Sequence, residues 1–83
     1  MSRLQVCIVY DASEYPTANN DIVKALGRRP DTGGVQYNEQ RNCMVRRMDY
    51  VNLWKEEADE MVEKLKQLNL KELEYRIDLW GVG

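Results

Sequence analysis

Apolar side chains recur at helical spacing within the segment 52–68, and this segment restricts the fold more than any other. The residues of the stripe lie three or four positions apart: Trp54, Ala58, Met61, Leu65 and Leu68. This spacing predicts an amphipathic helix with one face for a core. Acidic residues gather in its first half and lysines near its end, as the helix dipole favours. Such a helix has to pack against a second layer of structure.

The segment 73–80 alternates between apolar and polar residues. The apolar positions are Leu73, Tyr75, Ile77 and Leu79, and the polar positions between them are Glu74, Arg76 and Asp78. A period of two is typical of a strand with one buried and one exposed face. Trp80 follows in the polar phase. Either its indole lies on the open face of a sheet, or the chain bends there and folds the ring over the edge of the core.

The first third of the chain predicts a strand followed by a short helix. The run 4–10 (LQVCIVY) is β-branched and aromatic, which favours a buried central strand. Thr17 or Asn19 is a suitable N-cap for the helix, and its narrow apolar face includes Ile22 and Leu26. Gly27 is expected to end this helix.

The middle of the chain predicts a β-hairpin. Pro30, Asp31, Gly33 and Gly34 cluster as a turn, and two extended runs follow at 35–38 and 42–50. The second run places residues such as Arg47 on one side and Met48 on the other. Neither side is clearly apolar, so the pattern leaves the register of the hairpin open.

The predicted order is strand, helix, strand, strand, helix, strand. This βαββαβ order predicts a ferredoxin-like α+β sandwich, in which a four-stranded antiparallel sheet carries two helices on one face. With 83 residues and no linker, we expect a single domain over 1–83. The first and third strands would then be central neighbours, which would place Cys7 and Cys43 on adjacent strands.

Composition and charge predict a cytoplasmic protein without a membrane anchor. The net charge is −2, and no run approaches the ~18 apolar residues of a membrane-spanning helix. The N-terminus leads directly into a strand pattern rather than a signal-peptide core. The two cysteines are far apart in the sequence, so we expect reduced thiols packed as small apolar groups, with a disulfide as the alternative.

The residue types indicate a protein that is not an enzyme. The chain has no histidine, which is the commonest general base near neutral pH and the commonest transition-metal ligand. Its few hydroxyl residues lie outside nucleophile motifs, and many carboxylates fall on the single helix 52–68. We therefore expect no catalytic residue, metal site or cofactor.

A cluster of arginines suggests one binding function. The middle of the chain is locally basic, and its arginines suit contacts with phosphate or carboxylate. The candidate residues for RNA or DNA binding are Arg28, Arg29, Arg41, Arg46 and Arg47. Arg46 and Arg47 are adjacent on a predicted strand and would point to opposite faces. Nucleic-acid binding is therefore the alternative prediction.

The open face of the predicted sheet suggests the preferred function. Exposed tryptophan is enriched at protein interfaces, and methionines adapt to varied partners. The residues predicted to bind a partner are Trp80, Arg76, Met44, Met48 and Tyr50. We therefore expect a small protein-interaction module that docks through its open face or last strand, with a homodimer among the candidate assemblies. Regulators, adaptors and inhibitors encoded by viruses or mobile elements are proteins of this size class.

Overall fold

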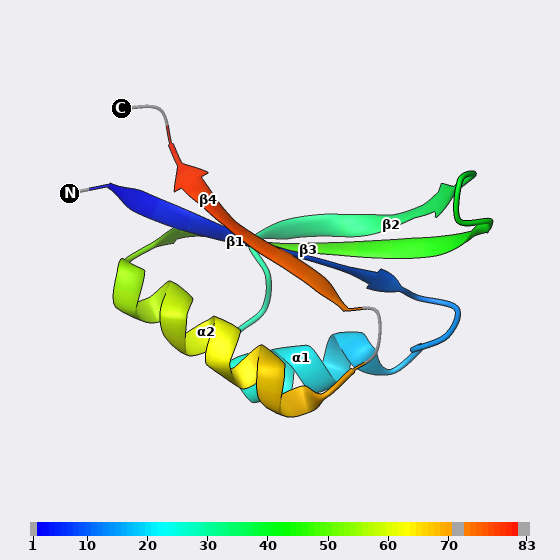
Figure 1. Ribbon diagram of the computed structural model, residues 1–83, viewed down its shortest axis with the longest axis horizontal. Helices are drawn as coiled ribbons and strands as arrows, with labels where there is room; N and C mark the ends of the chain where they lie inside the picture. The colour runs from blue at the N-terminus through cyan, green and yellow to red at the C-terminus, as the bar shows by residue number, and fades with distance from the viewer. Residues whose placement is uncertain (1, 71–72, 82–83) are drawn as a thin grey trace.

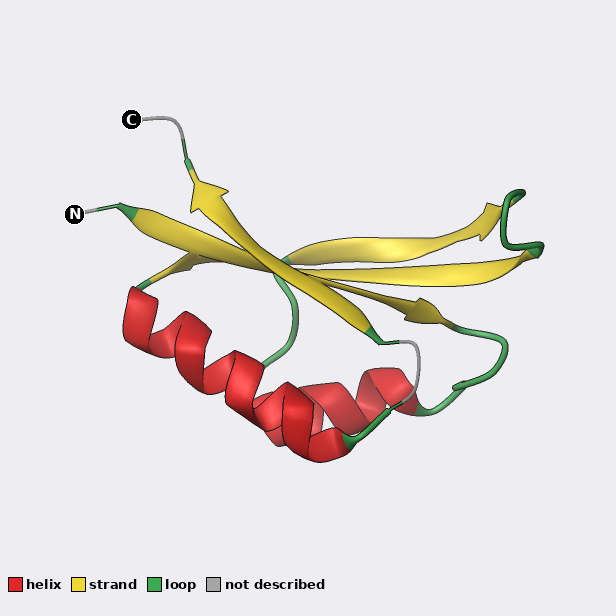
Figure 2. Cartoon of the chain, viewed as in Figure 1, coloured by secondary structure: helices red, strands yellow, loops and turns green. Residues whose placement is uncertain are grey.

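The computed structural model describes residues 2–70 and 73–81, which form an open four-stranded antiparallel sheet and two helices (Figure 1). The elements in chain order are β1 (Arg3–Asp11), α1 (Ala18–Leu26), β2 (Thr32–Asn38), β3 (Cys43–Leu53), α2 (Lys55–Leu68) and β4 (Glu74–Trp80). Both helices lie on the same face of the sheet, and the opposite face is left open (Figure 2). The architecture therefore belongs to the α+β class.

The strands are ordered β2-β3-β1-β4, and every neighbouring pair is antiparallel. The apolar strand β1 and the long strand β3 occupy the centre, so each is bonded on both sides. The strands β2 and β4 form the two edges. An edge strand leaves half of its backbone N–H and C=O groups unpaired, and these groups can bond to another chain.

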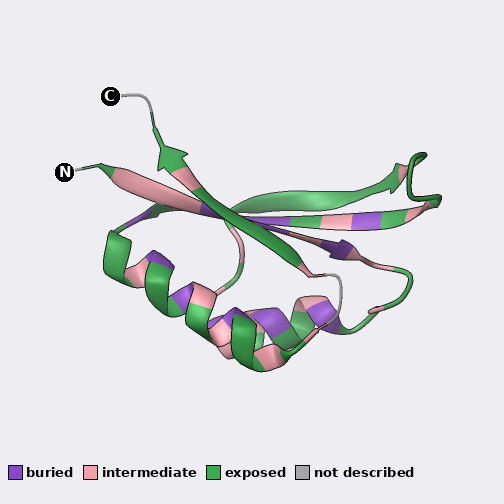
Figure 3. Ribbon diagram, viewed as in Figure 1, coloured by how far each residue is buried: buried purple, intermediate pink, exposed green. Residues whose placement is uncertain are grey.

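The core lies between the helices and alternate residues of the central strands. Val6 is opposite Tyr50 in the register and Ile8 is opposite Met48, and all four are buried. The strands also contribute Tyr10 and Leu53, and the helices contribute Ala18, Ile22, Leu26, Ala58, Met61 and Leu65. Buried positions accordingly follow the helix faces turned toward the sheet and the strands above them (Figure 3).

Both helices end where the sequence predicts. Gly27 has φ 74° and its N–H donates to the carbonyl of Val23 at 2.9 Å, which closes α1. Asn69 has φ 52° and closes α2 in the same left-handed conformation. Glycine and asparagine adopt this conformation at the lowest cost, which explains why they work as helix stops.

The start of α2 corrects the sequence prediction. β3 continues through Leu53, and α2 begins at Lys55, three residues later than expected. The register shifts between Leu4 and Val6, so β3 contains one extra residue, and Asn52 has φ 58° there. Leu53 thereby turns into the core, and Trp54 becomes the N-cap, whose N–H donates to Glu57 Oε1 at 3.0 Å. The indole therefore lies outside the apolar stripe of the helix.

The glycine pair also differs from the prediction, because Gly33 and Gly34 lie within β2 and not in a turn. Gly33 has φ 150°, and a Cβ atom placed on it would lie 2.1 Å from the carbonyl oxygen of Arg47. Nothing lies within 4 Å of the same position on Gly34. The strand thus needs glycine at position 33, where β2 approaches β3 too closely for a side chain.

Candidate functional site

The face of the sheet turned away from the helices is lined by polar and charged residues. Because Val6 and Ile8 point toward the helices, the intervening residue Cys7 and its cross-strand partners Asp49 and Arg76 point the other way. We call this surface the open face. Its residues include Arg3, Gln5, Cys7, Val9, Thr32, Gln36, Val45, Arg47, Asp49, Glu74, Arg76, Asp78 and Trp80.

Asp49 is the centre of the open face and is 8% exposed. Its carboxylate accepts hydrogen bonds from Arg47 Nε at 2.9 and 3.1 Å and from Thr32 Oγ1 at 3.2 Å. Burial acts to raise the pKa of Asp49, but hydrogen bonds from Cys7, Arg47 and Thr32, together with the charge of Arg47, hold that pKa below its ordinary value. The ionised carboxylate therefore joins β1, β2 and β3 from one position.

The Cys7 thiol packs against this carboxylate and is unsuited to act as a nucleophile. Burial raises the pKa of Cys7, and the hydrogen bond and charge of Asp49 raise it further. A thiol reacts through its thiolate, so a raised pKa lowers its reactivity. The cluster of Cys7, Asp49, Arg47 and Thr32 is therefore a structural polar network.

The two cysteines lie on neighbouring strands but far apart. Cys7 is opposite Asp49 and Cys43 is opposite Asn38, so six residues, or roughly 20 Å, separate the two positions along β3. Neither Cys7 nor Cys43 is part of a disulfide. Among the residues described, no group of three metal-ligating side chains could hold an ion.

Arg3, at the start of β1, lies beside two tryptophans. The Arg3 guanidinium carbon lies 3.3 Å from the centre of the Trp54 ring, and Arg3 is the cross-strand partner of Trp80. Both indoles are more than one-third exposed. The register thus places Trp80 on the open face, which was one of the two positions that the sequence allowed.

The other side of β4 carries a row of exposed apolar side chains. Tyr75, Ile77 and Leu79 pair with the buried β1 residues Ile8, Val6 and Leu4 and face the helix side, yet they are 37, 40 and 72% exposed. The described core cluster joins residues of β1, β3 and both helices and includes none from β4, most of which is exposed (Figure 3). We call these three residues the β4 stripe. Uncovered apolar surface of this kind marks binding sites in soluble proteins.

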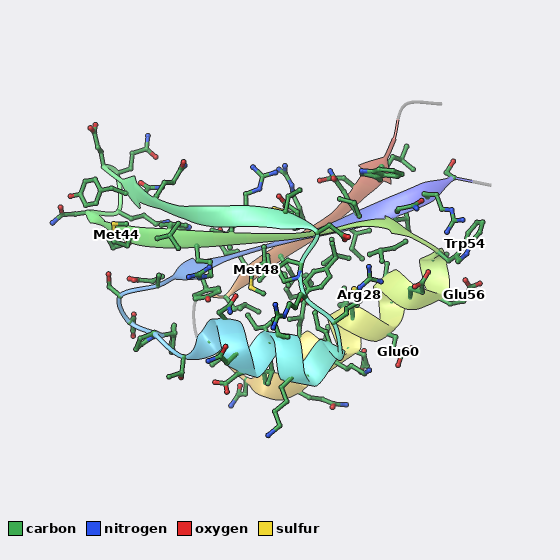
Figure 4. All side chains as sticks on the ribbon, turned by 180° about the vertical axis from the view of Figure 1, so that it is seen from behind. Arg28, Met44, Met48, Trp54, Glu56 and Glu60 are labelled. Carbon is green, nitrogen blue, oxygen red and sulfur yellow. The ribbon has the colours of Figure 1, made fainter. Side chains whose placement is uncertain are left out.

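Two of the five residues predicted to bind a partner are buried, so the prediction is wrong for them. Met48 and Tyr50 are 1 and 0% exposed because they share the phase of Val6 and Ile8 and point under the sheet, as Figure 4 shows for Met48. The Tyr50 hydroxyl donates to the carbonyl of Arg28 at 2.9 Å, and burial raises the pKa of Tyr50 to about 12. Both residues are core residues and not part of a surface.

The remaining three predicted residues are exposed but do not form one patch. Trp80 and Arg76 lie on the open face of β4. Met44 faces the helix side, at the end of the hairpin that extends past α1 (Figure 4). The sequence did not reveal the β4 stripe as a surface, because alternation marks which residues share a face and does not show where a helix covers that face.

The five candidate arginines are spread over different parts of the molecule. Arg46 and Arg47 point to opposite faces of β3, as the sequence predicts. Arg28 lies beside Asp31 and Glu57, at 3.6 and 3.8 Å, and Arg41 bonds Glu74 at 2.7 Å. Arg29 is exposed after α1. Arg47 is bonded to Asp49. Acidic side chains therefore offset the charges of Arg28, Arg41 and Arg47.

Known protein-family models, curated proteins and solved structures were compared with the chain, and none matched. Neither described helix combines the length and the apolarity that crossing a bilayer requires. The geometry of the chain itself must therefore support any functional conclusion.

Proposed function

We propose that this protein is a non-enzymatic protein-interaction module that offers β4 as its binding edge. The observation that carries the proposal is the β4 stripe: three large apolar side chains remain exposed on a strand that bonds to only one described neighbour. A partner strand added at such an edge gains main-chain hydrogen bonds and covers alternate side chains. On its size alone, we propose that the protein is a regulator, an adaptor or an inhibitor, with a virus or mobile element as a candidate source.

The open face supports a supplementary contact. Trp80 and Arg76 lie on the same strand as the stripe but on its opposite side, so a partner strand beside β4 would meet both sets of side chains. We also propose a ferredoxin-like assignment and one domain over 1–83, which the element order and the central pairing of β1 with β3 support. We propose a cytoplasmic location on the composition and charge of the sequence.

The alternative of nucleic-acid binding has less support. Its arginines lie on separate surfaces, and several already pair with acidic side chains. A protein that neutralises several phosphates needs free cations along one path. Strong binding of single-stranded RNA that falls steeply with salt would favour this alternative over the proposal.

The proposal is tested by capturing partners from an extract of native host cells. Immobilised wild-type protein is compared with Leu79→Lys on β4 and with Gln36→Lys, a matched charge on the other edge strand. We expect a protein retained by the wild type and by Gln36→Lys, and lost with Leu79→Lys. Retention that does not depend on β4, or no retained protein, would contradict the proposed role of this strand.

A further inference from the structure

We propose that the partner of β4 is a second copy of this chain, bound through antiparallel pairing of the two β4 strands around Ile77. This inference rests on the proposed function, because it names the partner of the same edge. It would join the two four-stranded sheets into one continuous sheet. The argument comes from the side chains that this pairing would bring together.

The charges on the open face of β4 are self-complementary. Arg76 Nε lies 2.9 Å from Asp78 Oδ2, and these side chains flank Ile77 on the same face of the strand. With a two-fold axis at Ile77, Arg76 lies opposite Asp78 of the second copy, and Asp78 lies opposite its Arg76. Directly opposed residues in an antiparallel pair have Cβ atoms about 5 Å apart, which suits an ion pair.

The opposite side of the strand matches as well. In the same register Ile77 meets Ile77 of the second copy, and Tyr75 meets its Leu79. The β4 stripe of each chain would thus cover the stripe of the other. The three side chains are exposed in the single chain, so the pairing gives them the apolar neighbours they lack.

Other registers satisfy fewer of these side chains. Centring the pair on Arg76 would set two arginines against each other and Glu74 against Asp78. Centring it on Asp78 would oppose two aspartates. Centring it between residues would place Ile77 beside a charged side chain. Like charges directly opposite each other destabilise a strand pair. Centring the pair on Tyr75 would also oppose Glu74 and Arg76, but only residues 74–76 of β4 would then be paired and Leu79 would stay uncovered. Among these registers, the one centred on Ile77 therefore pairs the whole strand with opposite charges facing each other.

The other edge strand, β2, has no charge pattern that would set a register. β2 contains no charged residue from Thr32 to Asn38, and two of its seven positions are glycine. Its exposed Val35 and Tyr37 do not specify a register by charge. β2 is therefore the appropriate control edge.

The test uses two charge reversals that repel alone and attract together. In Arg76→Asp both flanking positions are acidic, and in Asp78→Arg both are basic. We expect wild-type protein to form a dimer in sedimentation velocity experiments. Each single variant should weaken the dimer by about tenfold or more, because two attractive pairs become two repulsive ones. An equimolar mixture of the variants should recover a heterodimer of near wild-type affinity.

Two controls keep the result interpretable. Circular dichroism and thermal unfolding check that each variant is folded, and Gln36→Arg places a matched charge on β2. Dimers that resist both β4 reversals, or that are lost with Gln36→Arg alone, overturn the proposed pairing. A wild-type chain that is monomeric up to high concentration overturns the second copy as partner. In that case, β4-dependent capture of a different protein would still uphold the proposed function.

Discussion

β2 and β4 both end the sheet, and each bonds to a single described neighbour. β2 is uncharged and is tied into the chain: Thr32 donates to Asp49, and the Tyr37 hydroxyl donates to Asn42. β4 has charged and large apolar residues in alternation, and its ion pairs Arg41–Glu74 and Arg76–Asp78 lie on the exposed surface. Two side chains of β2 thus bond to other parts of their own chain, whereas the large apolar side chains of β4 remain exposed.

This difference shows that strand pattern and strand burial are separate properties. Val6 and its partner Ile77 lie on the same rung and face the same side of the sheet. Val6 is fully buried because helices pack beneath β1, and Ile77 remains exposed because it lies beyond them. Surface that a fold leaves unused in this way is available for binding.

The largest expected effect tests how closely β2 approaches β3. The substitution Gly33→Ala would force a methyl group against the carbonyl oxygen of Arg47. The backbone conformation at position 33 is also unfavourable for alanine. We expect the free energy of unfolding to fall by about 3 kcal/mol, measured by urea denaturation. Gly34→Ala is the matched control, with a change within about 0.5 kcal/mol. Equal effects would show that the close approach at β2 is not required.

The second prediction concerns the carboxylate that ties β2 to the centre. Asp49→Asn weakens charge-assisted hydrogen bonds and should cost about 2 kcal/mol at neutral pH. The pKa of Asp49 is lower in the folded state, so its contribution is complete above the ordinary value of 3.8 and is lost as the pH falls below it. Urea denaturation at pH 7 and pH 3 should therefore show the variant approaching the wild type in acid.

Its control is the exposed carboxylate of β4. Asp78→Asn, studied at concentrations where the protein is monomeric, should change the free energy of unfolding by less than about 0.5 kcal/mol. A larger loss for Asp78 than for Asp49 would reverse the comparison between the two edges.

The third prediction compares two tyrosines. Tyr50→Phe removes the hydrogen bond to the carbonyl of Arg28, which fixes the segment leading into β2, and should cost about 1 kcal/mol. Tyr75→Phe on β4 should leave the thermal midpoint of a monomeric sample unchanged within error. A cost at Tyr75 that matches the one at Tyr50 would mean that the β4 stripe contributes to the fold.

The smallest expected effect is on the β4 stripe itself. In a monomeric sample, Ile77→Thr should lower the free energy of unfolding by at most about 0.5 kcal/mol, since the side chain is already in contact with water. Val6→Thr, on the same rung, should cost about 2 kcal/mol because it buries a hydroxyl group in the core. Urea denaturation of both variants measures the difference directly.

Local patterns in the sequence predicted the strands and helices well. The apolar run of β1, the stop at Gly27 and the alternation of β4 all correspond to observed elements. The glycine pair was misassigned because glycine signals a turn and a close strand approach alike. Alternation also could not choose the buried side of β3, so Met48 and Tyr50 were wrongly expected at the surface.

The candidate site was less predictable for the same physical reason. Asp49 is held by residues from three strands, and the bonds depend on a register that the sequence leaves open. The exposure of the β4 stripe depends on which strands the helices cover, and the alternation within a strand does not show this. The phase of one strand was enough to place Arg76 on the polar side, whereas it left two positions open for Trp80, of which the structure has the one on the open face.

The extra residue at Asn52 reverses which side of the sheet the following residues face. Tyr50 and Leu53 differ by an odd number of positions, yet both point into the core. If Asn52 were instead a regular strand residue, strict alternation would turn Asn52 inward and Leu53 outward and would bring the indole of Trp54 beneath β1. A single left-handed residue thus determines that the chain enters α2 with a tryptophan at the surface, stacked on Arg3, rather than in the interior.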